Sequence, residues 1–366
     1  MKKNYLLMLT IFGAGLLVVS AGGIGSFPER SGYHPGFDTP SAKIISHNEY
    51  LTEAEIVFTS HLCSLLTELE GEMTAGVKDD PPVTVAIAII DTGIDPAHPE
   101  LMARLLPGYN FRSRNGDTAD RNGHGTMVAG VAVLSSGIAC GSGLDGRIML
   151  MPLVAANAKG ETTSGILAEA IRYAADHDAR IINVSYGGIA DRRILQEAAD
   201  YAWSKGAVIF AAAMNDFHGH PSFPAACDHV VAVTGLGLND YRASFANYGD
   251  WIDLAADGTW VPTTSRGGGY ALVNGTSFAA PATAGLGALL LLAKPELSNA
   301  ELVDILTGSA QDLGSPGFDP NYGFGRVDPA GSIEALRTEN LKKGQPGKER
   351  GENRPGYKKR AQKEAP

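Results

Sequence analysis

The chain has 366 residues, of which 44% are hydrophobic and 19% are charged, the composition of an ordinary globular protein. Its formal net charge of −10 argues against a general affinity for nucleic acid. Three cysteines are too few for a scaffold built from disulfides. In an oxidising compartment at most one disulfide can form within the chain, which leaves one thiol over, and the first candidate pair is Cys140 with Cys227 because both fall in the predicted core.

The N-terminus has the three parts of a secretory signal. Lys2 and Lys3 precede an apolar run over residues 5–19, and small residues follow at 20–23. The alternative is an uncleaved membrane anchor, but the run is shorter than the roughly 20 residues that a membrane-spanning helix needs. We therefore predict that residues 1–21 are a cleaved signal peptide, that the chain has no stable membrane span, and that the protein is secreted or periplasmic.

Residues 22–82 precede the first predicted core strand. Prolines and glycines make residues 27–49 irregular, and a capping box at Thr52 and Glu55 opens a predicted amphipathic helix that ends near Glu70. The segment is either a short prosegment or an extension that packs on the surface.

From residue 83, short apolar runs alternate with helical patterns. The predicted strands are 83–90, 148–154, 180–184, 207–213 and 230–233. The predicted helices lie near 125–134, 164–175, 192–204 and 277–292, and a capping box at Ser298 and Glu301 opens another. Strands that are apolar on both faces and separated by helices indicate a buried, mostly parallel sheet with helices on both sides. We predict one α/β domain over residues 83–336.

Residues 337–366 contain ten Lys or Arg against four Glu, a net charge of +6, which leaves −16 for the rest of the chain. Such a segment buries too little apolar surface to offset the entropy of ordering it. We predict a basic, disordered tail. It is either simply solvated or a tether to an anionic cell-surface polymer or lipid.

Asp91 begins the triplet Asp91-Thr92-Gly93 directly after the first predicted strand. Acidic residues at the carboxyl end of a parallel strand lie where α/β proteins place their ligand sites. Aspartic proteases use the same triplet, but they need two aspartates that share a proton, and the sequence has no second copy. The triplet therefore favours a different use of Asp91.

His124 lies between two glycines at the start of a predicted helix of small residues, which leaves room on both sides of its ring. A neutral imidazole activates a hydroxyl when its other nitrogen donates to a carboxylate. A capping or surface histidine is the alternative.

Ser277 lies in the segment 274–281 at the start of a long apolar helix. There, unpaired N–H groups and the helix dipole favour a developing negative charge. A simple N-cap serine is the alternative.

Together these segments, in the chain order Asp, His, Ser, resemble the subtilisin-like serine peptidases, or subtilases. The resemblance covers about residues 83–336. It includes four further segments, Asn183–Gly188, Phe210–Asn215, Arg242–Ala246 and Tyr322–Val327. The resemblance implies a subtilisin-like three-layer fold and an exported, monomeric serine endopeptidase that hydrolyses polypeptides through an acyl-enzyme.

The resemblance also implies a role for each matching residue. Ser277 is the expected nucleophile, His124 the general base and Asp91 the group that orients the imidazole. The side chain of Asn215 is the expected oxyanion donor. Loss of any of these four would indicate a non-catalytic protein that keeps the fold and binds peptides, but all four are present.

The expected substrate-binding residues are Ser185, Tyr186, Gly187 and Met214. The first three match the strand that pairs with an extended substrate. Subtilases often have glycine where Met214 stands, so its side chain either narrows the pocket for the residue preceding the scissile bond or packs in the core.

No organic or redox cofactor is implied, and calcium is possible but lacks a complete site. Glu100 stands where many subtilases have a calcium-ligating aspartate. However, residues 134–146 lack the asparagine-bearing loop that completes such a site. We therefore assign no metal ligand.

Overall fold

The computed structural model describes residues 43–46, 49, 65, 67–68, 71, 83–135, 147–188 and 191–338. Within them, seven strands form one parallel sheet in the order β3-β4-β2-β5-β6-β7-β8. The strands are β2 (Val85–Asp91), β3 (Tyr109–Asn110), β4 (Ile148–Val154), β5 (Ile181–Val184), β6 (Val208–Ala212), β7 (Val230–Leu236) and β8 (Leu254–Asp257). This sheet confirms the predicted α/β class.

The sheet has a separate hydrophobic cluster on each face. Along β2, Ile87 and Ile89 belong to one cluster, while Ala88 and Ile90 belong to the other, and all four are fully buried. Side chains alternate between the faces of a strand, so a strand covered on both sides reads as a continuous apolar run. This explains why the sequence pattern identified the central strands.

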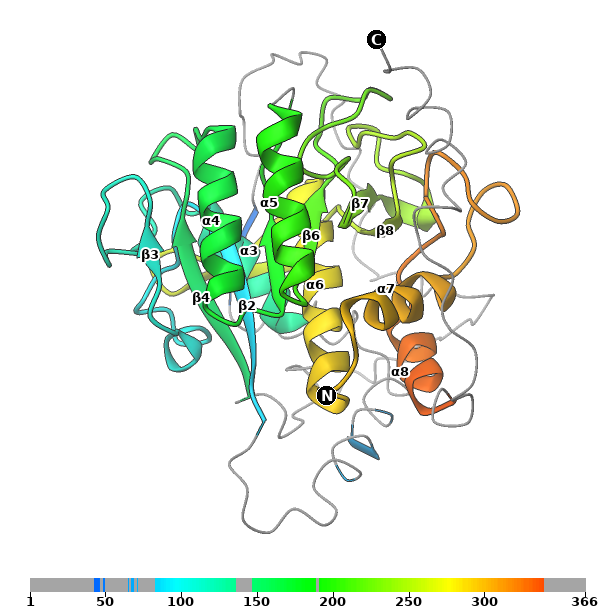
Figure 1. Ribbon diagram of the computed structural model, residues 1–366, viewed down its shortest axis with the longest axis horizontal. Coiled ribbons are helices and arrows are strands. Elements are labelled where there is room, and N and C mark those ends of the chain that lie inside the picture. The colour runs from blue at the N-terminus through cyan, green and yellow to red at the C-terminus, as the bar shows by residue number, and fades with distance from the viewer. Residues whose placement is uncertain are drawn as a thin grey trace, which may run out of the picture. The chain divides into compact units, whose positions relative to one another are not determined.

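Helices cover both faces of the sheet (Figure 1). On one side lie α4 (Ser164–Asp176) and α5 (Arg192–Ser204), which pack against each other and contribute to one cluster. On the other side lie α3 (His124–Leu134) and α6 (Thr276–Ala293), followed by α7 (Asn299–Gly308) and α8 (Pro329–Thr338). The three-layer arrangement agrees with the predicted subtilisin-like fold.

Side-chain caps define several helix starts. The Ser298 hydroxyl accepts from the Glu301 N–H, and the Glu301 carboxylate accepts from the Ser298 N–H, so the predicted capping box is present. The hydroxyl of Thr163 and the carboxylate of Asp191 cap α4 and α5. Two 3-10 helices, η1 (Met102–Arg104) and η4 (Leu238–Asp240), lie in the connections.

A second sheet lies beside α3. It is antiparallel and has the order β1-β10-β9, with β1 (Lys43–Ile45), β9 (Val261–Ser265) and β10 (Gly269–Val273). The hydroxyls of Thr263 and Thr264 donate to backbone oxygens of α3, at 2.5 and 2.7 Å. The sequence interpretation missed this sheet because its strands are short and contain polar residues and glycine.

Parts of the segment 22–82 pack on this domain. Ile45 of β1 is buried with Tyr270 and Leu272, and the helical residue Leu65 belongs to the main cluster. Glu68 accepts a hydrogen bond from Arg337 of α8 at 3.3 Å. Helix α8, which bears Arg337, extends to Thr338, two residues past the predicted end of the domain.

The predicted disulfide between Cys140 and Cys227 is wrong. Cys227 has a free thiol that is completely buried among apolar side chains. Burial raises the pKa of this thiol to about 12, so it behaves as a small apolar side chain. Cys63, Cys140, the predicted signal peptide and the tail beyond residue 338 lie outside the described residues.

Within the described ranges, one helix is long and apolar enough to cross a membrane. It is α6, and 83% of its apolar window is buried inside the domain. Such a helix is apolar all round because it is surrounded by the core.

Candidate active site

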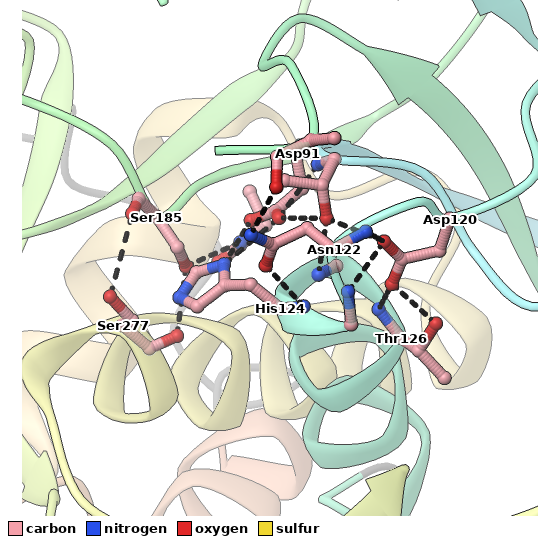
Figure 2. A network of polar contacts seen from close by, with 12 residues as sticks. Asp91, Asp120, Asn122, His124, Thr126, Ser185 and Ser277 are labelled. Atoms are coloured by element: carbon pink, nitrogen blue, oxygen red, sulfur yellow. Dashed lines mark hydrogen bonds and ion pairs between the residues drawn. The ribbon is translucent and has the colours of Figure 1, made fainter. Parts of the chain in front are cut away.

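The structure brings Asp91, His124 and Ser277 together. Asp91 is the last residue of β2, His124 is the first residue of α3, and Ser277 is the second residue of α6. Figure 2 shows the imidazole of His124 between the carboxylate of Asp91 and the side chain of Ser277. Three segments far apart in the sequence thus meet at the carboxyl end of a central strand, as the sequence predicted.

The Asp91 carboxylate holds the imidazole of His124. The distances from His124 Nδ1 to Oδ1 and Oδ2 of Asp91 are 2.9 and 3.0 Å. Asp91 is completely buried, and its Oδ1 also accepts from the backbone N–H of Thr92 at 2.7 Å. These contacts fix the ring with Nδ1 toward Asp91 and Nε2 directed away from it.

Burial lowers the pKa of the His124 imidazole, but the negative charges nearby raise it by more. The charge and hydrogen bond of Asp91, with a smaller contribution from the charge of Asp120, raise the pKa of the imidazole above its ordinary value. The same environment stabilises an imidazolium that forms when the ring accepts a proton.

Ser277 is fixed by reciprocal contacts with Ser185. The Ser185 hydroxyl donates to the Ser277 backbone oxygen at 2.8 Å, and the Ser277 hydroxyl lies 3.4 Å from the Ser185 backbone oxygen. Ser185 directly follows β5 and receives a further hydrogen bond from the Asn183 amide at 3.0 Å. The first turn of α6 is therefore fixed to the end of β5.

The amide of Asn215 lies beside the start of α6. Its Oδ1 accepts from the backbone N–H and the hydroxyl of Thr276, both at 3.0 Å. Its Nδ2 is on the side of Gly275, 3.5 Å from where a Cβ on that glycine would lie. The two donors of Thr276 thus set the orientation of the amide. Its Nδ2 lies next to Gly275.

Residues 185–188 form a segment that follows β5 and lies next to Met214. Gly188 and Phe223 exchange two backbone hydrogen bonds of 3.2 and 3.0 Å. A Cβ on Gly187 would lie 3.3 Å from Met214 Sδ and 2.9 Å from the Phe223 oxygen. The thioether of Met214 therefore occupies the space between the segment 185–188 and the strand end that bears Asn215.

Met214 has a φ of 77°, in the left-handed region that favours glycine. Its backbone N–H donates to the Thr276 hydroxyl at 3.0 Å, and its oxygen accepts from the Asn247 N–H at 3.0 Å. These bonds maintain a conformation that is costly for methionine.

Tyr186 has its side chain in the interior. It is 5% exposed, and its ring lies edge-on to His124 with 5.6 Å between centroids. Burial, with the charges of Asp91 and Asp120, raises the pKa of its hydroxyl. Its side chain thus packs against the His124 ring in the interior, while its backbone belongs to the segment 185–188.

The sequence interpretation missed Asp120, which is buried and joined to this network (Figure 2). Asp120 accepts hydrogen bonds from the residues that open α3, among them Thr126. The available signal was an aspartate five residues before the predicted helix 125–134, in the segment that leads into its first turn.

Glu100, which stands at the position of a calcium-ligating aspartate in many subtilases, contacts Tyr270 in the structure. Its Oε1 accepts from the hydroxyl of Tyr270 at 3.0 Å. In the part of the chain that the structure describes, no group of three or more His, Cys, Asp or Glu could hold a metal ion. Residues 136–146, which bear on the calcium question, are outside that part.

A buried aspartate that holds a histidine beside a serine is the arrangement of the serine-hydrolase triad. Residues 83–325 match the Subtilase family, peptidase family S8. The thermophilic serine proteinase of Bacillus sp. (strain AK1) is 38% identical over 238 residues, which are 65% of this chain and 59% of that proteinase. Subtilisin Savinase of Lederbergia lenta is 35% identical over 246 residues, 67% of this chain and 88% of Savinase.

The crystal structure of a lanthipeptide protease is also similar, with a TM-score of 0.65 and 26% identity. The match covers 79% of this chain and 96% of that one. The chain belongs to the subtilase family. The predictions of a subtilase fold and of a serine-type endopeptidase are confirmed at the level of the family.

Proposed function

We propose that this chain is an active, exported serine endopeptidase in which Ser277, His124 and Asp91 form the catalytic triad. The observation that carries the proposal is the pair of contacts from His124 Nδ1 to the buried Asp91 carboxylate. With Nδ1 occupied, Nε2 is the nitrogen left to accept a proton from Ser277.

The reaction follows from these positions. Ser277 Oγ attacks the scissile carbonyl as its proton passes to His124 Nε2, and a tetrahedral intermediate forms. The imidazolium then gives the proton to the leaving amine, which leaves an acyl-enzyme on Ser277. Water, activated by the same histidine, hydrolyses the ester. Asp91 balances the transient positive charge on the ring.

The negative oxygen of the intermediate needs donors that are already in place. We assign this role to the side-chain amide of Asn215 and the backbone N–H of Ser277. Thr276 supports the assignment, because its two hydrogen bonds hold Oδ1 and so fix the position of Nδ2, which lies on the side of Gly275.

Ser185, Tyr186 and Gly187 are the proposed substrate-binding segment. They follow β5 directly, beyond the ladder of the central sheet. Backbone pairing with a substrate strand reads the peptide rather than its side chains, so polypeptides are the expected substrates.

Met214 is the proposed determinant of specificity. A substrate carbonyl held between Ser277 and Asn215 directs the side chain of its own residue toward the space between Gly187 and Met214. The thioether already occupies part of that space. We expect a preference for small side chains before the scissile bond.

We also propose that residues 1–21 direct export and that the segment 22–82 stays with the mature domain. The second proposal is supported by the pairing of β1 with β10 and by the burial of Ile45 and Leu65. Mass spectrometry of the secreted protein tests both, because a mature N-terminus near residue 22 is expected and one near residue 83 contradicts retention.

A fluorophosphonate probe tests the catalytic proposal directly. The native protein should be labelled rapidly at Ser277 and should cleave peptides, and Ser277→Ala should do neither while remaining folded. A folded native protein that binds peptides but resists the probe would instead be a non-catalytic peptide-binding protein.

A further inference from the structure

Asp120 is a second buried carboxylate close to the site, and its side chain is held entirely by neutral donors. It is 6% exposed. Its Oδ1 accepts from the N–H groups of Asn122 and Gly123, at 2.9 and 2.8 Å. Its Oδ2 accepts from the N–H and hydroxyl of Thr126, at 2.9 and 2.6 Å. Both oxygens are thus used to shape the chain immediately around His124.

These bonds determine where α3 begins. The first N–H groups of a helix have no partner within it, and the backbone before α3 turns through Gly123 at a φ of 116°. Asp120 satisfies the N–H of Thr126 in the first turn and those of two residues before the helix. The Asn122 side chain adds an acceptor for the His124 N–H at 3.1 Å.

Thr92 connects this carboxylate to Asp91. Its hydroxyl oxygen lies 2.9 Å from Asp120 Oδ1 and 3.3 Å from Asp91 Oδ1, and it accepts from the Gly125 N–H at 2.9 Å. One hydroxyl therefore joins the end of β2 to the start of α3. We infer that the relative position of Asp91 and His124 depends on this junction.

We propose that Asp120 is a positioning residue for the catalytic base: it fixes the start of α3 so that His124 meets Asp91, and its negative charge supports the imidazolium. The proposal rests on the catalytic role of His124 proposed above.

The groups around His124 are consistent with this role. Asp91 faces the ring from β2, Tyr186 from the segment after β5, and Ser277 with Phe278 from α6. The cation nearest to Asp120 among its contacts is Arg266, whose guanidinium donates to the backbone oxygen of Asp120 at 3.3 Å and not to its carboxylate. Burial opposes charging of the ring, and Asp120 is one of the charges that raise the pKa of His124.

Asp120→Asn tests the proposal, with Asp117→Asn as the matched control. The control removes the same charge from the same loop, but the Asp117 side chain is 52% exposed and pairs with Arg121. We expect Asp120→Asn to lower kcat by roughly 10–100-fold, as for other small misplacements of catalytic groups. The acid limb of its kcat/KM profile should move to lower pH, whereas the control should keep the native profile.

An NMR titration separates this proposal from the proposed function. The pKa of His124 is measured in a Ser277→Ala background, with and without Asp120→Asn, so no turnover is needed. A lower pKa in Asp120→Asn supports the proposal. An unchanged pKa, or an equal shift in the Asp117→Asn control, overturns it.

Thr92 provides a second series if Asp120→Asn does not fold. Thr92→Val removes the hydroxyl that joins the two carboxylates, and Thr92→Ser keeps it. We expect the valine variant to lower kcat more than it changes KM, and the serine variant to keep most of the activity. Equal activity in both variants, at equal folded fractions, would refute a positioning role for this junction.

Discussion

Helices α3 and α6 begin in similar ways but have different electrostatic surroundings. Each has a glycine with positive φ as its N-cap residue, Gly123 or Gly275, without a capping side chain there. Each is almost wholly buried and carries one residue of the proposed triad in its first turn. At α3 the carboxylate of Asp120 accepts first-turn hydrogen bonds, whereas at α6 the neighbouring group is the neutral amide of Asn215.

The difference follows from the charge that each helix start must accommodate. In the proposed mechanism the ring on α3 becomes a cation, so nearby carboxylates stabilise it. The start of α6 would then stabilise an oxyanion, and a carboxylate there would repel it and occupy the donors. Two similar backbone arrangements are thus adapted to opposite charges by the side chain placed beside them.

Removing either reacting group should have the largest effect. Ser277→Ala and His124→Ala should each lower kcat by several orders of magnitude and leave the fold intact, because each removes a group that takes part directly in the proposed reaction and neither changes the backbone. Peptide turnover and circular dichroism check the two parts. Near-normal turnover by Ser277→Ala would exclude Ser277 as the nucleophile.

A negative charge at the start of α6 should remove the electrostatic difference between the two helix starts. Asn215→Ala should lower kcat by roughly 10²–10³-fold, the loss established for a subtilisin that lacks this donor. Asn215→Asp should lower it further, because the carboxylate repels the oxyanion. Steady-state kinetics at a pH where both variants are folded makes the comparison. Equal kcat values for the aspartate and alanine variants would contradict the charge argument.

The specificity proposal predicts a smaller change. Met214→Gly should raise kcat/KM for a substrate with Phe before the scissile bond relative to one with Ala, by roughly 10–200-fold. Glycine also suits the φ of 77° at this position, so the melting temperature should not fall sharply. A preference ratio within about twofold of the native value would mean that Met214 only packs.

The pKa of His124 predicts the acid side of the pH profile. The base must be neutral, so activity falls as pH decreases through its pKa, and the raised pKa moves this fall above the ordinary value of about 6.5. A pH series of kcat/KM on one peptide gives the midpoint. A flat profile between pH 5 and 8 would exclude His124 as the base.

The smallest effect is expected from the tail. Truncation after Thr338, the last residue of α8, removes the basic segment and should leave kcat/KM on a short peptide unchanged. A truncation that also removes Arg337 loses the contact with Glu68 and serves as the contrasting variant. A large loss from the shorter truncation would show that the tail contributes to the domain.

The sequence was informative where a pattern repeats or a motif is local. Central strands such as β2 are uniformly apolar because both their faces are covered, and the segments around Asp91, His124 and Ser277 are contiguous. The strands β9 and β10 gave no such pattern. Asp120 was missed because its importance comes from donors on other segments, such as Thr92, and not from its neighbours in the sequence.

Two further residues needed the packing to be described. Cys227 was assigned to a disulfide because it belongs to the core, but in the structure it is a free thiol among apolar side chains. The sequence left two orientations open for Met214; the structure shows its thioether next to Gly187, and its role in specificity stays a prediction.

The pairing of β1 with β10 has a consequence for molecules that lose their N-terminal segment. β1 occupies one edge of β10, and β9 occupies the other. A molecule trimmed past Ile45 would present the backbone N–H and C=O groups of β10 without a partner strand, an edge that recruits extended chains. Because β10 leads directly into the segment that bears Ser277, another copy adding to that edge would associate within a few residues of the nucleophile. Removal of β1 is therefore expected to cause aggregation.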